Sequence, residues 1–256
     1  LEYSLFLEMA GKADFTVRNP FIIVGGVHSI FSPEEVLQSE YVDAVCIGEG
    51  EDTFEEFIIK YQQNEDITGI GNLWVKKDGK IFKNDIMDLI PEDRLWSYER
   101  DYSFYDSEEY YLKPFEGKLY KKALVELSRG CPYSCNYCVN TALKKMYNGK
   151  GAFLRFKPMD KLKEELIGRV KEGFNLIQFL DENFLNIPLE KLEEFCAWYK
   201  ENIHLPMIIQ ARAESITEEK IKLLHEIGVH IEMSCGVETG SKKILNDICN
   251  RFTSKE

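Results

Sequence analysis

The sequence has no apolar run of the roughly 20 residues that a membrane-spanning helix requires. No basic segment followed by an apolar one stands at its start, so a secretory signal peptide is not expected. Basic residues are in the minority, with 32 Lys and Arg against 44 Asp and Glu and a formal net charge of −12. Proteins that bind the nucleic-acid backbone usually carry a basic surface. The sequence therefore predicts a chain with neither a transmembrane segment nor a nucleic-acid partner.

Histidine is also scarce, with four residues, whereas cysteine occurs seven times. Three of the cysteines are clustered within eight positions, from Cys131 to Cys138. Such a cluster of thiols is typical of a reducing compartment, so we expect a cytoplasmic protein. The other four stand in apolar patterns and are expected to be small buried hydrophobic residues: Cys46, Cys196, Cys235 and Cys249.

The clustered cysteines follow the apolar run 123–127 at the spacing C-x-x-x-C-x-x-C. Thiolates this close in a loop can converge on one soft metal centre, and three ligands leave one coordination position open for a small molecule. A structural zinc site normally closes with a fourth Cys or His. The nearest downstream cysteine is Cys196, and the next histidine is His204. Zinc and a chance cluster of buried cysteines stay as the competing interpretations.

Three stretches carry a family resemblance: Ser-Arg-Gly-Cys-Pro-Tyr-Ser-Cys-Asn-Tyr-Cys at 128–138, Phe-Leu-Asp-Glu-Asn-Phe at 179–184 and Gly-Val-Glu-Thr-Gly at 236–240. They resemble the radical S-adenosylmethionine (SAM) superfamily, and most of all its subgroup with an N-terminal cobalamin-binding domain. The resemblance implies a 4Fe–4S cluster whose open iron binds SAM. The residues that it assigns to the cluster are Cys131, Cys135 and Cys138.

Further SAM contacts follow from the same resemblance. In a (β/α) barrel the chemistry lies at the carboxyl ends of the strands. Acidic groups suit the amino group or the ribose hydroxyls of SAM, and a guanidinium fork suits its carboxylate. A salt bridge at the barrel rim is the competing interpretation for each. The residues implied are Tyr137 near the adenine, Asp181 or Glu182 near the SAM amino group, and Arg212 and Glu238 as further contacts.

Before the cysteines, short apolar runs at 20–26 and 43–48 alternate with helical patterns that open at Ser32 and cover 51–63. This alternation predicts a doubly wound α/β unit, in which ligands bind beyond the carboxyl ends of the strands. Glycine follows both runs, and a plain turn explains such glycines equally well. The resemblance implies a place near the nucleotide tail of cobalamin for these residues: Gly25, Gly26, Gly48, Glu49 and Gly50.

One departure concerns the cobalamin domain. The family usually carries an earlier D-x-H-x-x-G motif, and nothing like it precedes residue 20. His28 does not fit that motif and is expected to lie in a loop. Residues 1–13 have apolar side chains at helical spacing and predict a helix. We therefore expect only the second half of the cobalamin domain in this chain.

The predicted fold class is α/β, with a partial Rossmann-like cobalamin-binding unit before a partial (β/α) radical SAM barrel. A hairpin is expected at 71–83, where Asp78-Gly79 separates two short strands. The predicted boundaries are 1–85 for the first unit, 86–122 for a linker and 123–256 for the barrel. Barrel strands are expected at 123–127, 175–180, 206–210 and 230–234, with helices at 160–171, 188–202, 217–227 and from 241. The family barrel usually has six such units, so four predict a fragment, truncated at both ends.

The resemblance implies an enzyme that cleaves SAM to a 5′-deoxyadenosyl radical, followed by cobalamin-dependent transfer of a methyl group to an unactivated carbon. Oxidative cyclisation or rearrangement with the same cofactors is the alternative, and a non-catalytic iron–sulfur or zinc protein is a third. The expected partners are a small-molecule, lipid or natural-product substrate and an electron donor such as flavodoxin or ferredoxin.

Overall fold

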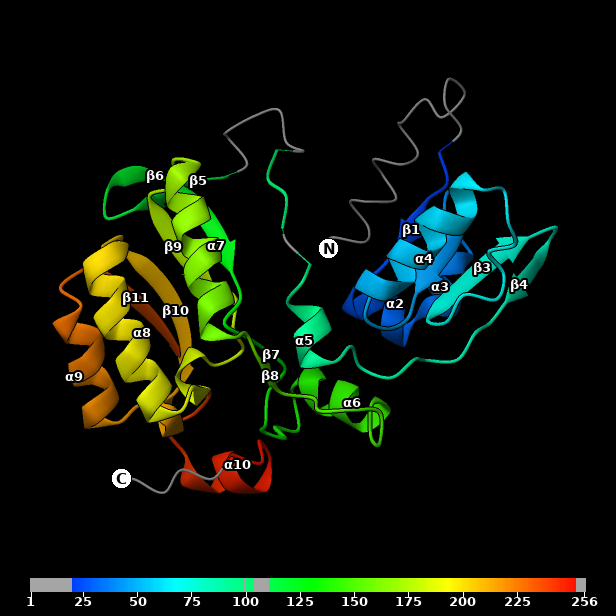
Figure 1. Cartoon of the computed structure of the whole chain (residues 1–256). Coiled ribbons are helices and arrows are strands. Elements are labelled where there is room, and N and C mark those ends of the chain that lie inside the picture. Colours follow the sequence, from blue (N-terminus) through cyan, green and yellow to red (C-terminus); the bar gives the residue numbers. More distant parts are fainter. Residues whose placement is uncertain (1–19, 99, 104–110, 252–256) are drawn as a thin grey trace. The chain divides into compact units, whose positions relative to one another are not determined.

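The computed structural model describes residues 20–98, 100–103 and 111–251 (Figure 1). The helix expected at 1–13 lies outside the described residues. The chain divides into two compact units, Leu1–Pro91 with Gly149–Gly151, and Glu92–Asn148 with Ala152–Glu256. Each unit is described by itself below. Among the described residues, no helix has both the length and the apolar character that crossing a membrane demands.

The first unit is a small α/β layer. Strands β1 and β2 are parallel, and β3 and β4 continue the sheet in antiparallel fashion in the order β1-β2-β3-β4. Its elements are β1 (Ile23–Val24), α2 (Val27–Phe31), α3 (Pro33–Leu37), β2 (Ala44–Cys46), α4 (Glu51–Gln62), β3 (Leu73–Lys77) and β4 (Lys80–Phe82). His28 lies on the short helix α2, so its expected place in a loop is wrong.

Both faces of this sheet are covered, because side chains alternate along β2. Ala44 packs in one buried cluster with Phe57 of α4, and Val45 packs in another with Val36 of α3. The hairpin β3–β4 is confirmed, with Lys77 opposite Lys80. Asp78 and Gly79 both have positive φ, of 51° and 72°, which is the backbone that a two-residue hairpin turn requires. The alternation of strands and helices thus gives the expected α/β unit.

The second unit is a curled sheet with helices on its outer side (Figure 1). Its strand order is β11-β10-β9-β6-β5, with β6, β9, β10 and β11 parallel and β5 antiparallel to β6; a separate pair is β7-β8. The elements are α5 (Glu92–Leu95), β5 (Leu112–Phe115), β6 (Lys118–Val125), β7 (Ser128–Arg129), α6 (Val139–Met146), β8 (Arg155–Phe156), α7 (Met159–Lys171), β9 (Leu176–Phe179), η2 (Phe184–Asn186), α8 (Leu189–Asn202), β10 (Met207–Arg212), η3 (Ala213–Ser215), α9 (Glu218–Glu226), β11 (Ile231–Gly236) and α10 (Lys242–Asp247).

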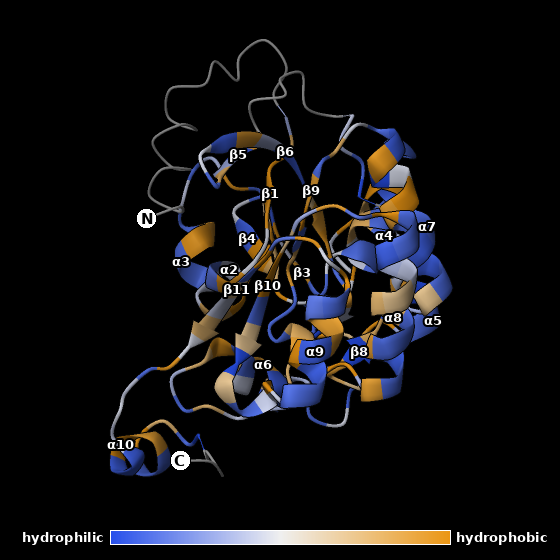
Figure 2. Cartoon of the chain, turned by 90° about the vertical axis from the view of Figure 1, so that its left-hand side faces the viewer, coloured by the Kyte–Doolittle hydropathy of each residue, from blue (hydrophilic) through white to orange (hydrophobic). Residues whose placement is uncertain are grey.

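Alternate residues of these strands serve two different purposes. Val125, Phe179 and Ile209 face outward into the core beneath α7, α8 and α9. Burying one such side chain fully stabilises the fold by about 2 kcal/mol. Figure 2 shows the strands largely apolar and the helices with mixed polar and apolar faces. Gln178 and Gln210 belong to the other set, which faces the inside of the curl. The expected strands and helices of a partial (β/α) barrel are thereby confirmed.

Strand β6 differs from its expected range of 123–127 at both ends. It begins at Lys118 because it forms a hairpin with β5, closed by Glu116 and Gly117 at φ of 48° and 72°. It ends at Val125 because the next free amide, that of Leu127, donates to the Asp181 carboxylate at 3.0 Å and not to a neighbouring strand.

The tip of this hairpin reaches the opposite margin of the sheet. Glu116 Oε1 lies 2.9 Å from Nδ1 of His230, the residue before β11. The rings of Phe115 and His230 meet edge to face at 5.0 Å, and Phe115 also packs on Ile208 inside the curl. The hairpin therefore covers the end of the sheet from which the parallel strands start.

Candidate functional site

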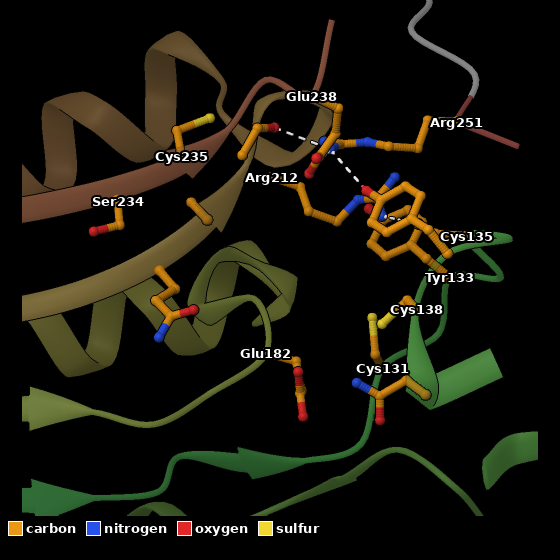
Figure 3. Close-up of a pocket in the computed structure, with 15 residues that line it drawn as sticks. Cys131, Tyr133, Cys135, Cys138, Glu182, Arg212, Ser234, Cys235, Glu238 and Arg251 are labelled. Atoms are coloured by element: carbon orange, nitrogen blue, oxygen red, sulfur yellow. Dashed lines mark hydrogen bonds and ion pairs between the residues drawn. The ribbon is translucent and has the colours of Figure 1, made fainter. Parts of the chain in front are cut away.

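A cavity of about 340 Å³ lies at the carboxyl ends of the strands of the second unit (Figure 3). On one side stand the cysteines of residues 130–138, called the cysteine loop here, and on the other the ends of β10 and β11. The site residues expected from the sequence that line it are Cys131, Cys135, Tyr137, Cys138, Glu182, Arg212 and Glu238. The structure thus gathers four separate stretches of sequence around one space.

The cysteine loop is fixed in place by its backbone. At Gly130, with φ of 91°, a Cβ would lie 2.0 Å from the carbonyl oxygen of Phe153, so only glycine fits there. Lys144 of α6 donates to the carbonyl oxygens of Pro132 and Tyr133, at 2.8 Å each. The first half of the loop is therefore held by its contacts with Phe153 and Lys144.

The three polar residues after β9 point alternately to two sides. Asp181, only 1% exposed, accepts hydrogen bonds from Leu127 N at 3.0 Å and Ser128 Oγ at 2.5 Å. Glu182 lines the cavity. Asn183 is buried again, and its Oδ1 accepts from the backbone of Arg212 at 3.2 Å. Such alternation is the rule for extended backbone. Of the two acids expected near SAM, the structure brings Glu182 to the cavity and places Asp181 beneath the cysteine loop.

Burial dominates the electrostatics of Asp181. It raises the pKa of this carboxyl from 3.8 to about 6, although the hydrogen bonds from Ser128 and Leu127 act in the opposite direction. The carboxyl thus loses more by leaving water than it regains from its donors.

Arg212 joins the strand β10 to the cysteine loop. Its Nη1 donates to Cys135 Sγ at 2.6 Å, and its Nη2 donates to Glu214 Oε1 at 2.8 Å. The guanidinium also lies 3.9 Å from the ring centre of Tyr133, a cation–π contact. Its Nε is buried and has no hydrogen-bond partner among the described residues. A cationic donor therefore remains available at the cavity wall.

Glu214, Arg251 and Tyr133 are contacts that the sequence reasoning missed. Arg251 is only 3% exposed and pairs with Glu214 at 2.9 Å and with Glu238 at 3.0 Å. Although burial alone would raise it, hydrogen bonds from Arg251 and Arg212 hold the pKa of Glu214 down at about 2. The sequence contains a weak indication of Glu214, because this residue stands two positions after Arg212, just past the end of a predicted strand. Arg251 follows a helix and had none.

In chemical type, three thiols are the donors that three corners of an iron–sulfur cluster take. All three thiols line the same cavity as Arg212, and the charge of Arg212 opposes the rise in pKa that burial causes at the Cys131 thiol. Within the described ranges, no three His, Cys, Asp or Glu side chains are already arranged to hold a metal ion. Cys196, the nearest downstream candidate for a fourth zinc ligand, lies on α8 in the hydrophobic core and not at the cavity.

Two other cysteines differ from their expected burial. Cys235 is exposed and lines the cavity, and Cys249 is half-buried after α10, so the expectation of buried small hydrophobic residues is wrong for both. Cys235 is on β11, the edge strand of the sheet among the described residues, which no described strand covers. Cys46 and Cys196 are buried as expected.

The glycine loops of the first unit lie after β1 and β2, as expected. Gly26 has φ of 94°, and a Cβ there would meet nothing within 4 Å, so bare backbone borders open space. A Cβ at Gly48 would lie 2.5 Å from Oδ1 of the buried Asn72, so packing alone requires this glycine. The Glu49 carboxylate accepts from the backbone of Ile90 at 2.9 Å. Gly25 and Gly50 flank Cys46, at 3.9 and 4.0 Å from an added Cβ.

Comparison with known families and proteins gives a consistent result. The profile described as "Radical SAM superfamily" matches residues 125–256, just over half of the chain. An uncharacterized methyltransferase of Pyrococcus horikoshii is 27% identical over 243 residues, covering 93% of this chain and 50% of that protein. The anaerobic magnesium-protoporphyrin IX monomethyl ester cyclase of Synechocystis is 26% identical over 237 residues, covering 90% of this chain and 44% of that protein.

Solved structures share the fold. The methyltransferase TsrM of Kitasatospora setae, bound to tryptophan substrate and a SAM analogue, has a TM-score of 0.70 at 17% identity over 95% of this chain and 46% of its own. The cobalamin-dependent SAM radical enzyme OxsB, with aqua-cobalamin and SAM bound, has a TM-score of 0.64 at 20% identity over 91% of this chain and 33% of its own. The expected fold class is thereby confirmed. The chain spans half or less of the length of these relatives.

Proposed function

Because this chain belongs to the radical SAM superfamily, we propose that it is the part of an enzyme that binds a 4Fe–4S cluster and SAM and starts radical chemistry on an organic substrate. One observation carries the proposal: the three clustered cysteines lie with Arg212, Glu182 and Glu238, from four stretches of sequence, around one cavity at the carboxyl ends of the strands. A closed zinc site would need a fourth ligand, and the one further cysteine in the cavity lining, Cys235, lies on β11 across the cavity from the cysteine loop (Figure 3).

We assign the cluster to Cys131, Cys135 and Cys138. In this family the reduced cluster supplies the electron that cleaves SAM into methionine and a 5′-deoxyadenosyl radical. The chain's own contribution is to bind, to orient and to exclude water. Burial raises the pKa of the Cys131 thiol, while the Arg212 guanidinium acts against this rise and favours the ligating thiolate form.

SAM contacts are assigned to residues of the cavity wall. The Nε of Arg212 is a buried donor without a partner among the described residues, and such a donor is satisfied by a carboxylate oxygen. Glu182 and Glu238 supply negative charge for an amino group or acceptors for ribose hydroxyls. Tyr137 offers an aromatic face to the adenine. Asp181 has no part in this assignment, because its carboxylate is already bonded beneath the cysteine loop.

We propose further that the reaction is cobalamin-dependent methyl transfer to an unactivated carbon. The similarity to a methyltransferase of Pyrococcus horikoshii and to the cobalamin-dependent OxsB supports this choice. In the first unit, Gly26 leaves backbone open to a ligand, whereas packing within the unit explains Gly48 and Glu49. Cyclisation is the second candidate, supported by the similarity to the magnesium-protoporphyrin cyclases.

The test uses the complete gene product that contains this chain. The protein is purified without oxygen, reconstituted with iron and sulfide, and given SAM with dithionite or with flavodoxin as the one-electron donor. We expect 5′-deoxyadenosine to form. An intact cluster that yields none would support a non-catalytic iron–sulfur protein.

A second measurement separates the two reaction types. SAM labelled in its methyl group is incubated with the enzyme, cobalamin that carries no methyl group, a reductant and candidate small-molecule or lipid acceptors. Label in a product supports methyl transfer, whereas 5′-deoxyadenosine without labelled product, together with loss of hydrogen from the substrate, supports cyclisation or rearrangement.

A further inference from the structure

Arg251 is the most thoroughly bonded side chain at the cavity, although no motif marks it. Its Nε and Nη2 donate to the two carboxylate oxygens of Glu214 at 3.2 and 2.9 Å. Its Nη1 donates to Glu238 Oε1 at 3.0 Å, to the carbonyl oxygen of Gly236 at 3.0 Å and to the Tyr137 hydroxyl at 3.3 Å. The residue is 3% exposed. A buried guanidinium with all three nitrogens engaged has one orientation only.

The partners of Arg251 come from three different places. Glu214 follows β10, Gly236 ends β11 and Glu238 follows it, and Tyr137 belongs to the cysteine loop. Figure 3 shows Arg251 opposite Glu238, with dashed lines that mark its bonds. One side chain thus sets the distance between two strand ends and the loop that bears the three cysteines.

Residues 248–251, called the covering segment here, also bind the cysteine loop through their backbone. Asn136 donates from N to the carbonyl oxygen of Cys249 at 3.1 Å and from Nδ2 to that of Ile248 at 2.9 Å. Asn250 Nδ2 donates to the carbonyl oxygen of Ser134 at 2.7 Å. Three hydrogen bonds besides those of the Arg251 side chain therefore join this segment to the cysteine loop.

The charges around residue 251 explain why this position requires arginine. Glu214 pairs with both Arg212 and Arg251, so that two cations and two carboxylates alternate from Arg212 to Glu238. A lysine could not reach Glu214, Glu238 and Tyr137 together, because its ammonium is a single point without a planar fork. Gly236 also has to be small here, because a Cβ would lie 2.8 Å from Glu238 Oε1.

We propose that Arg251 is a positioning residue that orients Tyr137 and Glu238 for the adenosyl half of SAM, an inference that rests on the SAM site proposed above. Glu214 holds the guanidinium in register, and Arg251 itself touches no reacting atom. A purely structural role for Arg251, as a tie that keeps the cysteine loop folded, is the competing explanation. The two roles differ in whether the loss of Arg251 affects iron binding or SAM binding.

The experiment measures iron per chain, the thermal midpoint and the dissociation constant for SAM in the reconstituted complete gene product. Arg251→Met and Arg251→Lys are compared with Lys243→Met, which removes an exposed charge from the preceding helix α10. We expect both Arg251 variants to keep their iron and to bind SAM about tenfold more weakly, the change for one charge-assisted hydrogen bond. Lys243→Met should match the wild type.

The double variant Arg251→Met, Glu238→Gln supplies a second readout. If Arg251 acts by positioning Glu238, the double variant should bind SAM no more weakly than the single variant with the lower SAM affinity. Both substitutions then remove the same contact between Glu238 and SAM. SAM-induced change in the electron paramagnetic resonance spectrum of the reduced cluster should weaken in parallel.

Three other results would overturn the inference or its premise. Wild-type SAM affinity in Arg251→Met contradicts positioning. Iron and SAM binding that fall together, with a lower thermal midpoint, assign Arg251 to folding of the loop alone. A wild-type protein that holds its cluster and binds no SAM contradicts the proposed function itself, and the inference falls with it.

Discussion

Arg212 Nη1 lies 2.6 Å from Cys135 Sγ, which brings the end of β10 into direct contact with the cysteine loop across 77 positions of sequence. The same guanidinium stacks on Tyr133, two residues before Cys135. The guanidinium that bonds Cys135 and the ring that fixes this guanidinium therefore belong to one arrangement.

Arg212→Lys should weaken SAM binding by about tenfold, because lysine keeps the charge but loses both the planar fork to Glu214 and the stack on Tyr133. Equilibrium dialysis with labelled SAM measures this change at matched iron content. Arg94→Lys, on the exposed helix α5, is the control. An Arg212→Lys protein with wild-type affinity would remove Arg212 from the SAM site.

Cys135→Ala should abolish most of the iron and sulfide that the reconstituted protein retains, because two thiolates do not hold a cluster that needs three. Cys196→Ala is the matched control: it also removes a buried thiol, but from the core under α8, at a stability loss of about 1 kcal/mol. The measurement is iron and sulfide per chain with the visible absorbance. Equal loading of the two variants would show that the ligand assignment is wrong.

Asp181 should make the protein less stable as the pH rises from 4 to 7. Its pKa is raised in the folded state to about 6 from 3.8, so its favourable contribution is full below about pH 4 and is lost as the pH passes through about 6. Asp181→Asn removes this loss. The free energy of unfolding of the variant, relative to that of the wild type, should therefore increase by on the order of 3 kcal/mol from pH 4 to 7.

Urea denaturation at several pH values measures that difference. Asp160→Asn, at the exposed first turn of α7, controls for the removal of a carboxylate. The reasoning fails if the stability difference between the Asp181→Asn variant and the wild type stays constant from pH 4 to 7, or shrinks.

Gly130→Ala should destabilise the second unit far more than Gly173→Ala. Both glycines have positive φ, of 91° and 84°, which costs alanine about 1–2 kcal/mol in either position. At Gly173 the added methyl group meets nothing within 4 Å, whereas at Gly130 it lies 2.0 Å from the carbonyl oxygen of Phe153. Thermal unfolding and iron content measure the effect. Equal midpoints for the two variants would contradict the close approach.

The two hairpins show how far the sequence could predict the fold. Asp78-Gly79 is a preferred two-residue turn, and the hairpin at 71–83 was predicted from it. Glu116-Gly117 has the same pair of positive φ angles, but glutamate is not a residue that usually adopts them. The hairpin β5–β6 was therefore missed, and its residues were placed in a linker.

For the site, strand ends were predictable and tertiary pairings were not. Arg212, Glu182 and Glu238 were found because they follow apolar runs, and the ends of parallel strands meet at one edge of a sheet. Asp181 and Glu182 could not be separated, because which of two neighbours faces the cavity depends on where the strand ends. Arg251 follows α10 in the sequence and bonds Glu238 at the cavity. No local sequence pattern predicts such a contact.

The contact of Glu116 and Phe115 with His230 has a mechanical consequence for the whole second unit. The contact joins the two edges of the sheet at the end remote from the thiols, so the strands are fixed relative to one another at that end. We therefore expect any widening that admits a ligand to take place at the rim, by a splaying of β10 and β11 away from the cysteines.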